Sequence, residues 1–181
     1  RLDEAIDCYR RALQIKPDFA EACDNIGIAL QAQGKLDEAI GYYQQALRIN
    51  PDLVETHNSL GILLASRNRL DEAIDHYRQA LKIKPDFVHA HNNLGAALQS
   101  KGNLSEALVH YRLALQGMPD SVEINNNLAW ILATHPDPNM RDAKQAIALA
   151  ERAAATTNHQ NAIILNTLAA AYAEMGRFSN A

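Results

Sequence analysis

Residues Leu70 to Phe87 have the sequence LDEAIDHYRQALKIKPDF, and lightly edited copies of this stretch recur along the chain. The copies begin at Leu2, Leu36 and Leu104, and each contains a proline two residues before its end. Successive prolines are 34 residues apart, at Pro17, Pro51, Pro85 and Pro119. A constant period of this size is typical of a stacked repeat array. The sequence therefore predicts a repeat architecture.

Each repeat is predicted to contain two helices, joined by a tight turn and ended by the proline. Apolar residues at three- and four-residue intervals predict helices over 3–16, 20–33 and 37–49. Gly34 is placed to end the first helix of a pair in the left-handed region. Asn68 takes this place one repeat later, and asparagine enters that region more readily than most residues. Proline ends the second helix because its ring cannot fit inside one.

Small residues recur inside the predicted helices. Gly27, Gly61 and Gly95 each follow a leucine or isoleucine, although a glycine inside a helix costs about 1 kcal/mol relative to alanine. This cost is understandable where the two helices of a pair cross closely. The residues expected to face these glycines are small or aromatic: Ala39, Ala73, Ala107, Tyr43, Tyr77 and Tyr111.

This pattern of Leu-Gly, alanine, aromatic and proline in 34 residues resembles the tetratricopeptide repeat. The chain departs from it at the opening aromatic position, which holds Cys23, His57, His91 and Asn125. The resemblance implies an all-α fold, a right-handed superhelical α-solenoid of antiparallel helix hairpins. It also implies that the first helix of each hairpin lines a concave groove.

The predicted organisation is a single array over residues 1–181. Its parts are the second helix of a truncated repeat (1–19), three regular repeats (20–53, 54–87 and 88–121), an irregular repeat with an insertion (122–161) and a truncated repeat (162–181). Pro136 and Pro138 exclude an α-helix within the insertion. We expect the exposed terminal helices to drive self-association or fraying, since repeat arrays normally end in a polar cap and neither end of this sequence shows one.

Asparagines on the first helices are the candidate peptide-binding residues. The predicted groove residues are Asn25, Asn58, Ser59, Asn92, Asn93, Asn126, Asn127 and Trp130. A carboxamide both donates and accepts hydrogen bonds, so a row of them can hold the backbone of an extended peptide. This row resembles the asparagine ladder in the tetratricopeptide arm of O-linked N-acetylglucosamine transferases, although Ser59 interrupts it.

Two structural interpretations remain open for these residues. The asparagines can instead solvate the groove or bond to neighbouring repeats. Trp130, the only tryptophan, either faces the groove as a binding hot spot or packs under the loop 135–141.

Composition and spacing argue against several functional classes. The net charge is −4, whereas nucleic-acid binding requires a basic stripe. No apolar run reaches the roughly 18 residues of a membrane span, and no signal segment opens the sequence, so a cytoplasmic location is expected. The histidines lack the spacing of a metal site, and no catalytic set or cofactor motif emerges.

We therefore predict a non-catalytic interaction module without cofactor or metal, which binds an extended peptide or a partner helix in its groove. An alternative is the substrate-recognition arm of a larger enzyme such as a glycosyltransferase. A third is a scaffold that assembles end to end.

Overall fold

The computed structural model describes residues 1–176, which form ten α-helices, one short 3₁₀ helix and no strand. The α-helices are α1 Leu2–Ile15, α2 Ala20–Ala32, α3 Leu36–Ile49, α4 Val54–Ser66, α5 Leu70–Ile83, α6 Val88–Ser100, α7 Leu104–Gly117, α8 Val122–Thr134, α9 Ala143–Thr156 and α10 Ala162–Glu174. The predicted helices 3–16, 20–33 and 37–49 agree with α1, α2 and α3 within one residue at each end. The repeat boundaries themselves stay a prediction.

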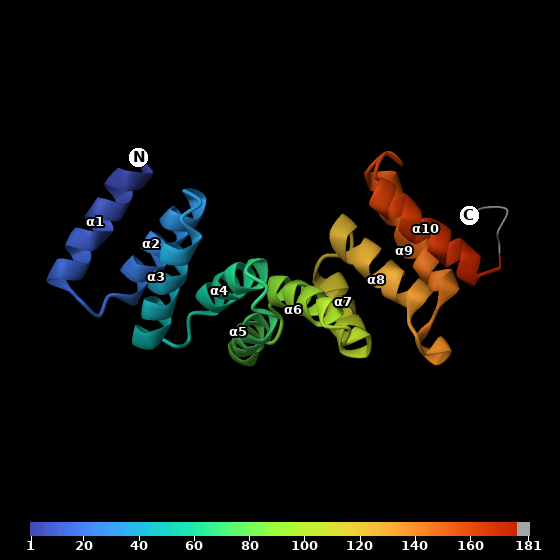
Figure 1. The fold of residues 1–181 in the computed structure, drawn as a ribbon, viewed down its shortest axis with the longest axis horizontal. Helices are drawn as coiled ribbons and strands as arrows, with labels where there is room; N and C mark the ends of the chain where they lie inside the picture. The colour runs from blue at the N-terminus through green and yellow to red at the C-terminus, as the bar shows by residue number, and fades with distance from the viewer. Residues whose placement is uncertain (177–181) are drawn as a thin grey trace. The chain divides into compact units, whose positions relative to one another are not determined.

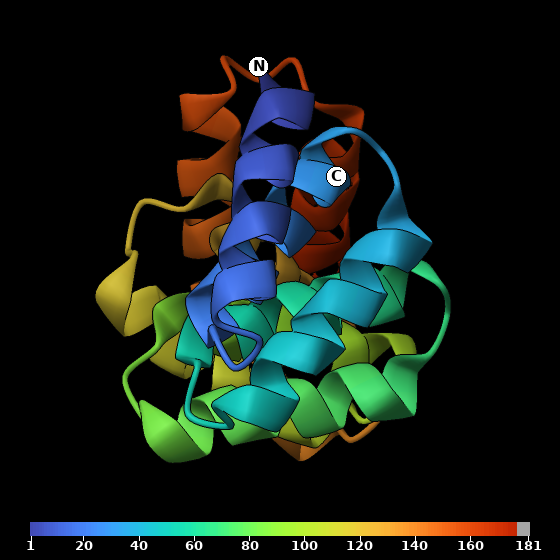
Figure 2. The ribbon, with the colours of Figure 1, turned by 90° about the vertical axis from the view of Figure 1, so that its left-hand side faces the viewer.

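The helices belong to two compact units, Arg1–Ala90 and His91–Ala181. In the first unit α2 pairs with α3 and α4 with α5, while α1 packs on α2 and α3 on α4 (Figure 1). Figure 2 places α1 in the foreground of this unit. In the second unit α7 packs on α8, α8 pairs with α9, and α10 contacts both α8 and α9. The predicted all-α solenoid of stacked helix pairs is confirmed.

The close helix crossing expected from the glycines is present in each regular hairpin. A Cβ atom added at Gly61 on α4 would lie 2.5 Å from Cε1 of Tyr77 on α5. At Gly95 on α6 the corresponding atom would lie 2.9 Å from Cε1 of Tyr111 on α7. Carbon atoms normally sit about 3.5–4.0 Å apart. Glycine therefore makes room for the buried tyrosine ring, and this contact fixes how the two helices cross.

The turns inside the hairpins use the left-handed residues that the sequence indicates. Gly34 has φ 76° and Asn68 has φ 60°. After Gly34, the amide of Lys35 donates to the carbonyl of Leu30 at 2.9 Å, which satisfies one of the last carbonyls of α2. The predicted turn chemistry at Gly34 and Asn68 is confirmed.

The insertion after α8 holds no α-helix, as its prolines predict, but it does contain the 3₁₀ helix η1, Pro138–Met140. Proline fits the first position of a helix because the amide it lacks would have no partner there. Asp137 caps η1 by accepting from the Asn139 amide at 2.9 Å. Asp142 caps α9 in the same way.

The last five residues of the predicted repeat 162–181 lie outside the described residues.

Candidate functional site

A cavity of about 260 Å³ in the second unit brings together several predicted groove residues. Its lining comes from three helices, with Gln99 on α6, Asn126, Asn127 and Trp130 on α8, and Ile163, Asn166 and Thr167 on α10. No charged side chain lines this cavity, which we call the Trp130 pocket. It combines four carboxamides with one aromatic and one aliphatic side chain, and this composition suits an uncharged polar chain with an apolar group.

Trp130 is half-buried and lines the pocket together with Asn126 and Asn127. Ile163, 70% exposed, supplies the apolar side chain on α10. Asn126 keeps its Oδ1 buried without a hydrogen-bond partner among the described residues. A buried acceptor left unpaired is costly, so a donor from a ligand or a water molecule would be favourable there.

Asn92, another predicted groove residue, is only 8% exposed. Its Nδ2 donates to Oε1 of Glu123 at 3.0 Å, which links α6 to α8. Asn93, the next residue on α6, is half-buried. In this geometry the amide group of Asn92 serves the contact between neighbouring first helices.

The first unit carries the remaining predicted residues. Asn25 on α2 and both Asn58 and Ser59 on α4 are half-buried. A hydrogen bond of 2.7 Å from the Thr56 hydroxyl to Oδ1 of Asp24 links α2 to α4. Burial raises the pKa of Asp24, and this hydrogen bond opposes the shift.

The histidines and Asn125, which replace the opening aromatic, have a role that the sequence did not indicate. Nδ2 of the buried Asn125 donates to the carbonyl of Pro119 at 2.8 Å and to that of Ser121 at 2.7 Å. His57 Nε2 lies 3.0 Å from the carbonyl of Pro51 in the same way. The side chains of His57 and Asn125 therefore fasten the proline loop to the first helix that follows it.

Two histidine pairs also form within the hairpins. Nδ1 of His57 lies 2.9 Å from Nδ1 of His76, and the same distance separates these atoms in His91 and His110. Because His57 Nε2 must donate to the Pro51 carbonyl, the neutral ring accepts at Nδ1 and His76 donates. Burial lowers the pKa of both His57 and His76.

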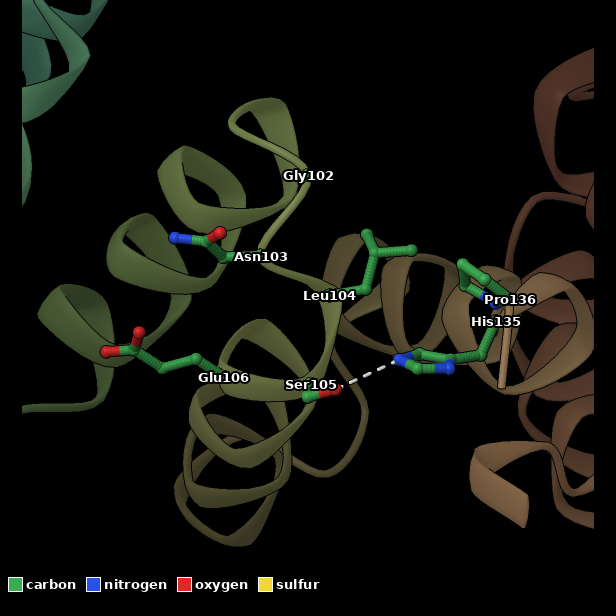
Figure 3. A pocket seen from close by; sticks show the side chains of 7 residues that line it. All are labelled: Gly102, Asn103, Leu104, Ser105, Glu106, His135 and Pro136. Carbon is green, nitrogen blue, oxygen red and sulfur yellow. Dashed lines mark hydrogen bonds between the residues drawn. The ribbon is translucent and has the colours of Figure 1, made fainter. Parts of the chain in front are cut away.

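A second cavity, of about 510 Å³, lies between the start of α7 and the loop after α8 (Figure 3). There Ser105 Oγ lies 3.2 Å from Nε2 of His135, and Figure 3 shows these two side chains pointing toward each other. Nδ1 of His135 lies 3.1 Å from the amide nitrogen of Asp137 and 3.3 Å from the carbonyl oxygen of the same residue. Each tautomer of the neutral ring therefore has a backbone partner, and the loop holds the imidazole beside the Ser105 hydroxyl.

Within residues 1–176, no three histidine, cysteine, aspartate or glutamate side chains gather as ligands for a metal ion. Among the described helices, none combines the length and apolar character that crossing a membrane requires.

Models of the tetratricopeptide repeat match residues 1–34, 18–86 and 59–122, and together they extend from residue 1 to residue 122. The chain is a tetratricopeptide repeat protein. Proteins of this family are generally interaction modules. No curated protein matches this sequence.

Solved structures show the same tetratricopeptide fold. The crystal structure of YrrB, a tetratricopeptide repeat protein with an unusual peptide-binding site, has a TM-score of 0.83 and 17% identity, and the match covers 95% of this chain and 86% of YrrB. A crystal structure of MamA has a TM-score of 0.75 and 19% identity, with 88% and 90% covered. MamA of Desulfovibrio magneticus RS-1, from residue 41 to its end, has a TM-score of 0.73 and 17% identity, with 89% and 88% covered. At these identities the likeness concerns the fold alone.

The structure also includes pocket residues that the sequence analysis did not select. Gln99 and Ile163 line the Trp130 pocket, although neither was predicted to be a groove residue. A glutamine two repeats earlier, Gln31, occupies the equivalent place, and this recurrence was the available signal for Gln99. No periodic signal marks Ile163, because the insertion shifts its repeat out of phase.

Proposed function

We propose that this protein is a non-catalytic interaction module that binds an extended peptide through the first helices of its repeats, with the Trp130 pocket as the principal contact. The observation that carries the proposal is the convergence of Asn126, Asn127 and Trp130 on one uncharged cavity. A half-buried tryptophan that lines a pocket is typical of an interface hot spot. The peptide-binding site of YrrB, which shares the fold, supports the same class of ligand.

A library of random 12-residue peptides displayed on phage tests the proposal. Peptides are selected on the full chain and then measured individually against Trp130→Ala and Asn127→Ala. We expect the selected peptides to lose at least about tenfold in affinity for Trp130→Ala, the loss typical of a hot-spot residue.

The matched control for Trp130→Ala is Ile28→Ala. Ile28 occupies the equivalent repeat position on α2 and is 51% exposed. Its replacement should leave binding unchanged, and circular dichroism should show that both variants stay helical. Selected peptides that bind Trp130→Ala as tightly as the wild type would exclude the pocket as the binding site.

Two other roles remain proposals. As the recognition arm of a larger enzyme, the chain would present the same asparagines, and the catalytic activity would belong to another domain. Self-association would use the terminal helices, and on the first of them, α1, Ile15 is 87% exposed and Leu2 is 44% exposed. Light scattering tests this second role, since the apparent mass should rise with concentration and an Ile15→Gln variant should reduce that rise.

A further inference from the structure

The Tyr111 hydroxyl controls how one wall of the Trp130 pocket is oriented. Tyr111 is fully buried, and its ring fills the space left by Gly95. Its hydroxyl donates to Oε1 of Gln99 at 2.9 Å. The oxygen of the Gln99 amide is thereby occupied. The group that Gln99 has left for the pocket is Nε2, which carries two N–H donors.

Asn126 on α8 presents the opposite kind of group to the pocket. Its Oδ1 is buried and has no hydrogen-bond partner among the described residues. A carboxamide oxygen accepts hydrogen bonds, so the free group of Asn126 is an acceptor.

The pocket consequently offers donors on α6 and an acceptor on α8. A peptide backbone presents C=O and N–H groups on its two sides, which complement such walls. Trp130 and Ile163 add apolar surface to the lining, which contains no charged side chain. Its volume of about 260 Å³ exceeds the 150 Å³ or so of a cavity known to hold benzene, so one medium-sized side chain fits.

We infer that the Trp130 pocket selects an uncharged apolar residue of an extended peptide, with Gln99 donating to its carbonyl, Asn126 accepting from its amide, and Tyr111 as the positioning residue for Gln99. This inference rests on the proposed function and adds to it the chemistry of the ligand. An acidic or basic side chain is disfavoured, because it would enter a cavity that lacks a counter-charge.

The first unit provides a matched control for Tyr111. There the Tyr43 hydroxyl donates to Oε1 of Gln31 at 2.8 Å, and its ring fills the space left by Gly27. Tyr43→Phe and Tyr111→Phe thus remove the same group from equivalent hairpins. Both keep the ring that supports the helix crossing, so the loss of packing is small in both.

The test uses N-acetyl-L-leucine N-methylamide as a probe and the indole N–H signal of Trp130 in nuclear magnetic resonance spectra as the readout. This signal is site-specific because the chain has one tryptophan. At the efficiency usual for small ligands, a probe of this size should bind with a dissociation constant of about 1 mM. The glutamate and lysine counterparts should shift the signal at least about tenfold more weakly.

Tyr111→Phe should weaken binding of the leucine probe by about fivefold, the effect of one neutral hydrogen bond, and Tyr43→Phe should leave it unchanged. Any of three results would overturn the inference. The three probes could bind equally, the leucine probe could cause no shift, or Tyr111→Phe and Tyr43→Phe could have equal effects. If library peptides still lose affinity for Trp130→Ala in that case, the proposed function stands without this ligand chemistry. If they do not, both fail.

Discussion

The close contact between Gly61 and Tyr77 leads to a quantitative prediction. A Cβ at residue 61 would lie 2.5 Å from Cε1, 2.9 Å from Cδ1 and 3.0 Å from Cζ of Tyr77. Tyr77 is 2% exposed, so its ring cannot move into solvent. Gly61→Ala must therefore separate α4 from α5 or distort the ring. Overpacking of this kind costs roughly 1–3 kcal/mol.

Helix propensity acts in the opposite direction, since alanine gains about 1 kcal/mol over glycine in a helix interior. Gly61→Ala should therefore destabilise the protein by roughly 0–2 kcal/mol. Gly41 provides the matched control, because it also lies inside a helix of the first unit, α3, and a Cβ there would meet nothing within 4 Å. Gly41→Ala should stabilise the protein by about 1 kcal/mol.

Urea unfolding followed by far-ultraviolet circular dichroism measures the difference. Repeat arrays can unfold in segments, so the two variants, which alter the same unit, are compared at equal protein concentration. The midpoint should fall for Gly61→Ala relative to Gly41→Ala by the equivalent of about 1–3 kcal/mol. Replacing Tyr77 with leucine should remove much of the penalty, which gives a coupling of at least about 0.5 kcal/mol. Equal stabilisation by both alanine variants would refute the reasoning.

Three further predictions concern buried polar groups. Burial lowers the pKa of His57 and His76 below the usual value of about 6.5, so their contribution to stability is complete above that pH and is lost as the pH falls below it. His57→Asn, which preserves the bond to the proline carbonyl, should reduce the loss of urea midpoint between about pH 7.5 and pH 5; an unchanged loss would contradict this origin. Burial raises the pKa of Asp24, so its carboxylate opposes folding at neutral pH, and Asp24→Asn should raise the urea midpoint while Thr56 keeps its acceptor; a lower midpoint would show that the charge is stabilising. Asn125→Ala removes two buried hydrogen bonds and should cost about 2 kcal/mol, whereas Asn125→His should cost less in the same unfolding experiment.

The helices and turns could be predicted from the sequence because they depend on the conformational preferences of individual residues. The left-handed turns at Gly34 and Asn68 depend on the conformational preference of single residues, which are visible in the chain. Gly61 and Gly95 indicated that the two helices of their hairpins cross closely, because glycine inside a helix is destabilising unless such a contact requires it. Each repeat is short and packs only on its neighbours, so the period of the sequence is enough to predict the architecture.

The candidate site depends on tertiary structure. The sequence selects Asn92 and Asn126 by the same periodic argument, yet the amide of Asn92 donates to Glu123 while Asn126 lines a cavity. A position in the repeat cannot distinguish these outcomes, because the surroundings of each amide come from the first helix of the next repeat. For Asn92 that helix supplies Glu123, whereas for Asn126 it supplies Ile163.

The array of helical hairpins follows from the amino-acid sequence, since period, glycine and proline are properties of the chain. The polarity of the Trp130 pocket depends instead on how separate helices pack. Gln99 lies on α6, the Tyr111 hydroxyl that occupies its oxygen lies on α7, and Asn126 with its unpaired oxygen lies on α8. How these three helices pack determines which amide atoms are occupied, and therefore which donor and which acceptor the pocket presents.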